Sequence, residues 1–132
     1  ELGIGELRLI APAALLPSAD EFPGARRYSS PEEGLRAADV VMTLRIQKER
    51  MAEAEIPDAD AYFARFGLTE PRLRLARPDA IVLHPQPMNR GIEIASEVAD
   101  GPQSAIRDQV RNGVAVRMAV LARLLQPRAA PA

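Results

Sequence analysis

Four short segments along the chain are predicted to be strands, and each one is separated from the next by polar or helix-like sequence. They cover residues 7–11, 25–28, 39–43 and 80–83. The third run is apolar at almost every position, which is typical of a parallel strand covered on both faces. Strands that alternate with helices predict an α/β fold, with a parallel, doubly wound, Rossmann-like sheet flanked by helices.

Helix signals lie between these runs. Ser30 followed by Pro31 and Glu33 combines a cap, a proline at the first helical position and an acidic residue three positions on, and it predicts a helix to about Ala38. Further helical segments are expected over residues 13–16, 57–66, 69–77 and 92–98. Tyr62 would lie on the packing face of the second of these.

The longest helix is expected over residues 104–125. Ile106, Val110, Val114 and Met118 recur every four residues, and further apolar residues widen this stripe. A stripe of that width predicts burial against more than one surface. The last residues, 126–132, are expected to form a disordered tail.

Composition narrows the possible functions. The 132 residues carry a net charge of −1, so nothing favours nucleic acid or an anionic membrane as a partner. The absence of cysteine excludes disulfides and thiolate metal sites, and a single histidine excludes a histidine-rich metal site. No apolar run approaches the roughly 20 residues of a membrane helix, and no signal peptide is evident. A cytoplasmic protein is therefore expected.

The first residues suggest that a longer chain precedes them. Glu1 stands where an initiator methionine is usual, and Leu2-Gly3 resembles the last turn of a helix with its glycine cap. We therefore expect an upstream helix, and we expect this sequence to be the carboxyl-terminal part of a larger two-domain protein.

Arg45 is the first candidate for chemistry because it follows the third apolar run directly. The carboxyl ends of parallel strands are where ligands bind in open α/β sheets. A guanidinium there can hold a carboxylate or phosphate through two hydrogen bonds, and Gln47 would lie on the same side of an extended segment. The structural alternative is that Arg45 pairs with Glu49 or another nearby acid while Gln47 is solvated.

The turn that follows the fourth run is the second candidate. Pro85 and Pro87 lack amide donors, so the turn around Gln86 offers carbonyl oxygens, which suit an amide or ammonium group better than a phosphate. An X-Pro bond in so tight a turn is also a candidate for the cis form. The structural alternative is a rigid turn with His84 as a satisfied, half-buried residue.

Other polar residues receive mainly structural interpretations. Lys48, Glu49 and Arg50 form either a solvated charged face or a mobile lid beside Arg45. Glu93 and residues 89–91 are expected to cap the next helix and turn the chain.

Together these stretches resemble the aspartate carbamoyltransferase family, in its carboxyl-terminal, aspartate-binding domain. The matching segments are residues 42–50, 77–85, 87–91 and 98–104 with the final helix, in the family's order. The related ornithine enzymes usually carry cysteine at the position of Pro85, so the proline favours aspartate. Many bacterial members have glycine where this chain has Gln86.

The resemblance implies roles for the candidate residues. Arg45 and Gln47 would bind the carboxylates of aspartate, and the backbone carbonyls of Gln86 and Pro87 would meet the amino group of carbamoyl phosphate across a cis bond. Lys48, Glu49 and Arg50 would begin a loop that closes over the substrates. The implied reaction carbamoylates aspartate for pyrimidine synthesis, and it needs neither a metal nor an organic cofactor.

The resemblance also implies what this sequence lacks. Residues 1–125 would form the aspartate-binding domain, incomplete at its amino-terminal side, and the carbamoyl-phosphate domain with its catalytic residues would lie upstream. Family enzymes are homotrimers that variously join regulatory or dihydroorotase-like chains. The chain alone is therefore expected to be inactive. The alternatives are a non-catalytic carboxylate-binding or assembly module, or a carbamoyltransferase for another amine such as ornithine.

Overall fold

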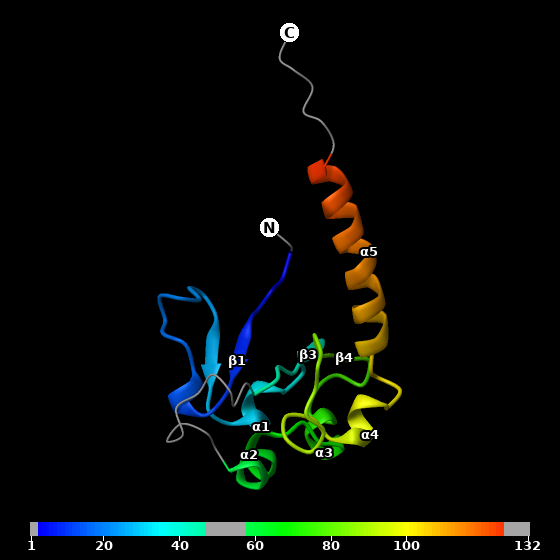
Figure 1. Cartoon of the computed structure of the whole chain (residues 1–132). Coiled ribbons are helices and arrows are strands. Elements are labelled where there is room, and N and C mark those ends of the chain that lie inside the picture. The colour runs from blue at the N-terminus through cyan, green and yellow to red at the C-terminus, as the bar shows by residue number, and fades with distance from the viewer. Residues whose placement is uncertain (1–2, 47–57, 126–132) are drawn as a thin grey trace.

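The computed structural model describes residues 3–46 and 58–125, and these form an α/β arrangement with a long carboxyl-terminal helix (Figure 1). In chain order its elements are β1 (Arg8–Ile10), η1 (Ala13–Leu15), β2 (Arg26–Tyr28), α1 (Pro31–Gly34), β3 (Val40–Met42), α2 (Ala59–Phe66), α3 (Glu70–Leu73), β4 (Ile81–Leu83), α4 (Ser96–Ala99) and α5 (Ile106–Leu125). The four predicted strands are all present, and each is shorter than the segment that was predicted to form it. The predicted tail lies outside the described residues.

The strands pair in parallel, as the alternating pattern predicts, but as two separate pairs. β1 pairs with β2, and β3 pairs with β4 in the register Val40↔Ile81 to Met42↔Leu83. The α/β class with parallel strands is confirmed, and within the described residues no ladder joins β1 to β3. The edges of β1 and β3 instead both line an open cleft of about 760 Å³.

The main core surrounds the β3–β4 pair. Val82, Ile94 and Ile106 are almost fully buried there. Ile106 begins α5, and Ala105 N–H donates to the Val82 carbonyl, so the first turn of α5 is tied to β4. This core holds the carboxyl ends of β3 and β4 in a fixed relation.

Helix α1 begins as predicted and ends early. The Ser30 hydroxyl accepts a hydrogen bond from the Glu33 N–H at 3.4 Å, and Pro31 takes the first helical position. The α-helix ends at Gly34 instead of near Ala38, because Ala37 adopts a left-handed conformation (φ 54°) and its N–H donates to the Leu75 carbonyl. A contact distant in sequence thus overrides the local helical preference.

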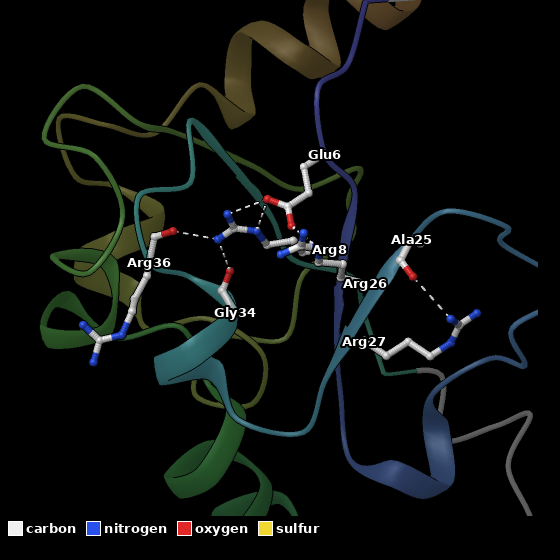
Figure 2. A network of polar contacts seen from close by, with 7 residues as sticks. All are labelled: Glu6, Arg8, Ala25, Arg26, Arg27, Gly34 and Arg36. Atoms are coloured by element: carbon white, nitrogen blue, oxygen red, sulfur yellow. Dashed lines mark hydrogen bonds and ion pairs between the residues drawn. The ribbon is translucent and has the colours of Figure 1, made fainter.

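Arg8 ties this short helix to the first strand (Figure 2). Its guanidinium donates to the carbonyls of Gly34 and Arg36 and to the Glu6 carboxylate, which also pairs with Arg26 at 3.1 Å. The Arg8 hydrogen bonds hold the pKa of the Glu6 carboxyl below its usual range. One arginine therefore links β1, β2 and the end of α1.

Two predicted helices have different bounds in the structure. α3 ends at Leu73 instead of near Arg77, because the chain turns there to enter β4. The predicted helix over residues 92–98 is α4, which begins only at Ser96. Ile94 instead forms a parallel β-bridge to Leu68, so the residues just before α4 are extended and not helical.

Helix α5 projects away from the rest of the molecule (Figure 1). Beyond Ile106 its apolar residues are exposed, including Val114, Met118 and Leu121. The burial expected of this stripe is therefore not formed by contacts within the described residues. No helix in residues 3–46 and 58–125 is long and apolar enough to cross a membrane.

Candidate functional site

The two candidate loops begin at the same edge of the β3–β4 pair. Met42 and Leu83 are opposite each other in the parallel register, and the Thr43 N–H donates to the Leu83 carbonyl at 3.0 Å. The segment with Arg45 and the turn with Gln86 follow immediately. Parallel pairing in this register is what brings two loops, about forty residues apart in sequence, to one place.

Arg45 and the proline turn line the same cleft. Arg45 is half-buried, while Pro85, Gln86 and Pro87 are exposed on the cleft wall. A small diacid in this space would have a guanidinium on one side and a turn rich in carbonyls on the other. The predicted Gln47, Lys48, Glu49 and Arg50 lie outside the described residues.

The proline turn contains the cis X-Pro bond that its sequence made a candidate. The Gln86–Pro87 peptide bond is cis, and Gln86 has φ 65°. The left-handed region favours glycine because it has no Cβ to clash with its own backbone. Gln86 adopts this conformation with a full side chain.

A buried pair lies directly behind this turn. His84 is 0% exposed and Glu93 is 3% exposed, with His84 Nε2 at 3.2 Å from Glu93 Oε1. The Gln86 N–H donates to His84 Nδ1 at 2.9 Å, and the Asn89 N–H donates to Glu93 Oε1 at 2.5 Å. Glu93 was expected to cap a helix, but α4 begins three residues later, and its carboxylate instead holds the end of the proline turn.

This pair could not be predicted from the sequence. The separation of nine positions between His84 and Glu93 matches neither a helical nor a strand period. Only the return of the chain under the turn brings the two side chains together.

Tyr62 and Glu93 also line the cleft. Burial raises the pKa of the Tyr62 phenol, and the Glu93 carboxylate acts in the same direction. Tyr62 therefore keeps its proton at neutral pH and offers a hydroxyl near the site. Among the described residues, no group of three or more His, Asp or Glu side chains could hold a metal ion.

Comparison with known proteins identifies the family. The family model for the aspartate/ornithine carbamoyltransferase Asp/Orn-binding domain matches residues 19–124. The chain belongs to the aspartate/ornithine carbamoyltransferase family.

Curated relatives within this family are aspartate enzymes. The chain is 55% identical to the aspartate carbamoyltransferase catalytic subunit of Brucella anthropi over 125 residues, which cover 95% of this chain and 39% of the relative. The catalytic subunit of Brucella ovis is 54% identical over the same length. The chain thus spans about two fifths of the length of these relatives.

Solved carbamoyltransferase structures share the fold. Aspartate transcarbamoylase from Trypanosoma cruzi in complex with carbamoyl phosphate matches with a TM-score of 0.71 and 32% identity, over 86% of this chain and 38% of that one. Ornithine carbamoyltransferase from Thermus thermophilus matches with a TM-score of 0.76 and 26% identity, over 92% and 40% respectively. The carbamoyltransferase domain predicted from the sequence motifs is thereby confirmed.

Proposed function

We propose that this chain is the aspartate-binding portion of an aspartate carbamoyltransferase that acts as a homotrimer in the cytoplasm. The observation that carries the proposal is the common cleft of Arg45 and the cis Gln86–Pro87 turn. The identity of 55% to a subunit named for the aspartate enzyme supports the choice of aspartate.

In the proposed reaction the amine of aspartate attacks the carbamoyl carbon of carbamoyl phosphate. A C–N bond forms, the C–O bond to phosphate breaks, and the amine loses a proton, which gives N-carbamoyl-aspartate and phosphate. Catalysis of this kind depends on holding two reactants in register and on stabilising the developing negative charge. Holding the reactants and stabilising this charge can both be done by protein side chains and backbone groups without a metal.

Each candidate residue has a role in holding the substrates. The Arg45 guanidinium binds a carboxylate of aspartate through two hydrogen bonds, with Gln47 beside it. The carbonyls of Gln86 and Pro87 accept hydrogen bonds from the amino group of carbamoyl phosphate. Lys48, Glu49 and Arg50 close over both.

Substitution of Arg45 tests the proposal in the full-length enzyme. Arg45→Ala should lower kcat/KM for aspartate by about 10- to 100-fold, because a hydrogen bond to a charged group contributes roughly 1.5–3 kcal/mol. The matched control is Arg74→Ala, which removes an exposed arginine whose ion pair within the described part of the chain is with Glu70 on the surface. Equal steady-state kinetics for wild type and Arg45→Ala would overturn the assignment of Arg45.

The 132-residue chain by itself should give no carbamoyl transfer. It spans only about two fifths of its relatives, and the proposed site needs a carbamoyl-phosphate domain to complete it. A radiometric or colorimetric assay with aspartate checks this, with the full-length enzyme as positive control. Measurable turnover by the isolated chain would contradict the prediction.

Two alternatives have distinct outcomes. Activity of the full-length enzyme with ornithine and not with aspartate would assign it to the other branch, which solved neighbours also represent. Tight binding of a bisubstrate analogue in calorimetry without any turnover would instead indicate a non-catalytic binding or assembly module.

A further inference from the structure

We propose that His84 and Glu93 are positioning residues that set the orientation of the Gln86–Pro87 turn, and that His84 must be neutral with its proton on Nε2 to do so. The inference deepens the proposed function, since the turn it positions is the proposed carbamoyl phosphate contact.

The hydrogen bonds of the pair reach both ends of the turn. His84 Nδ1 accepts from the Gln86 N–H, and Glu93 Oε1 accepts from the Asn89 N–H. The imidazole and the carboxylate are joined to each other through Nε2 and Oε1. Residues 84–89 are therefore clamped from behind by one continuous network.

The clamp binds two amides of the turn, and among the described residues no backbone N–H donates to the carbonyls of residues 85–87. Pro85 and Pro87 have no N–H, so Gln86 and Asn89 supply two of the few backbone donors in this stretch. Both donors are directed to the buried pair. The Gln86 N–H shares its peptide plane with the Pro85 carbonyl, and the Asn89 N–H shares its plane with the Met88 carbonyl. Fixing these two planes holds the chain on both sides of the Gln86–Pro87 peptide, so the carbonyls of Gln86 and Pro87 lie between two fixed peptide groups.

The direction of these bonds assigns the His84 proton. A neutral imidazole has one N–H and one acceptor nitrogen, and Nδ1 is the acceptor for the Gln86 amide. Nε2 must then carry the proton and donate to the Glu93 carboxylate. A doubly protonated ring would oppose the Gln86 N–H with a second N–H and lose that hydrogen bond.

Stability alone does not account for this pair. Glu93 Oε2 is buried and has no hydrogen-bond partner among the described residues. An unsatisfied buried carboxylate oxygen is costly, and a buried ion pair is often no more stabilising than apolar residues of similar size. The Glu93 carboxylate lines the cleft and accepts a hydrogen bond from the turn, which an apolar side chain could not do. We therefore infer that it is present to orient the turn.

Two variants of His84 in the full-length enzyme separate its two hydrogen bonds. His84→Asn keeps an acceptor near the position of Nδ1, and His84→Gln keeps a donor near the position of Nε2. The clamp predicts that His84→Gln lowers kcat/KM for carbamoyl phosphate by about tenfold or more, the equivalent of one hydrogen bond. His84→Asn should lose several-fold less, and KM for aspartate should change little in both.

Glu93→Gln tests the other half of the network. Its amide oxygen can still accept from both donors, so it should retain more activity than Glu93→Ala. Gly101→Ala serves as the stability control, because a Cβ there would lie 2.7 Å from the Glu97 carbonyl oxygen and Gly101 does not line the cleft. Equal losses for His84→Asn and His84→Gln that simply follow their melting temperatures would overturn the positioning role.

The tautomer gives a readout that does not depend on turnover. A nitrogen-15 NMR difference spectrum between wild type and His84→Gln isolates the His84 ring. A protonated Nε2 and an unprotonated Nδ1 at neutral pH support the inference, and a proton on Nδ1 overturns it. Wild-type enzyme that lacks turnover but has this tautomer would refute the proposed function and leave the clamp standing.

Discussion

At the scale of single residues, the proline turn has one feature that its sequence predicts and one that depends on a tertiary contact. Two prolines around Gln86 made a cis bond a candidate from sequence, and the Gln86–Pro87 bond is cis. The positive φ of Gln86 was not predicted, because nothing in a glutamine side chain signals a left-handed conformation. In this conformation the Gln86 N–H donates a hydrogen bond to His84 Nδ1.

Gly34 is a residue whose importance also depends on tertiary contact. A Cβ at this position would lie 2.6 Å from two atoms of Ile10 and 3.2 Å from Tyr28 Cβ. Gly34→Ala should therefore lower the free energy of unfolding by about 1–3 kcal/mol, as overpacking of a buried site does. Urea denaturation followed by circular dichroism measures this.

Gly113 provides the matched comparison for Gly34. A Cβ there would meet nothing within 4 Å, and the residue lies inside α5. Gly113→Ala should be neutral or raise helix content, since alanine favours a helix interior by up to about 1 kcal/mol over glycine. If both alanine variants behaved alike, the close approach of α1 to β1 and β2 would be contradicted.

At the scale of elements, boundaries set by neighbouring residues were predicted better than boundaries set by distant partners. The cap at Ser30 depends on residues within four positions, and the structure has it. The ends of α1 and α3, and the start of α4, depend on partners far along the chain, such as Leu75 for Ala37 and Leu68 for Ile94. At these boundaries a backbone hydrogen bond to a residue distant in sequence outweighs the local helical propensity.

The carboxyl end of α4 is tied to the segment after the proline turn by an ion pair. The Arg90 guanidinium binds both Asp100 carboxylate oxygens, at 2.7 and 3.0 Å. These hydrogen bonds hold the pKa of the Asp100 carboxyl below its usual range. The folded state therefore releases the Asp100 proton more readily than the unfolded state does.

This pair should stabilise the fold only where Asp100 is ionised. Its contribution is complete above the unfolded carboxyl pKa of about 3.9 and is lost as the pH falls through the lower folded pKa. Wild type should thus exceed Asp100→Asn in urea midpoint at pH 7, and the difference should vanish near pH 2. Added salt should weaken it because both groups are exposed. A difference that grew on acidification would contradict this account.

At the scale of the whole molecule, two features remain incompletely covered. The β1 and β3 edges face a cleft, and α5 exposes an apolar stripe. An exposed patch of this kind on a helix usually marks a contact with another part of a protein. Packing of α5 on an amino-terminal carbamoyl-phosphate domain stays a prediction from the family resemblance.

Charged substitutions on the stripe test that packing. Val114→Glu combined with Met118→Glu should lower the melting temperature of the full-length enzyme by several degrees, since burying unpaired charge is costly. The same changes in the 132-residue chain should have little effect, because both side chains are more than half exposed there. Equal effects in the two contexts would show that α5 does not gain a covering surface.

The sequence predicted the strands as local elements, the cap of α1 and the long helix, because the signal for each lies within a few neighbouring positions. It also placed Arg45 and Gln86 after strands, which made a common edge predictable. Tertiary structure alone decided that the strands form two pairs, that helices end early and that His84 and Glu93 meet behind the turn. Those outcomes depend on which distant groups satisfy buried backbone and side-chain hydrogen bonds, and sequence spacing carries no record of that choice.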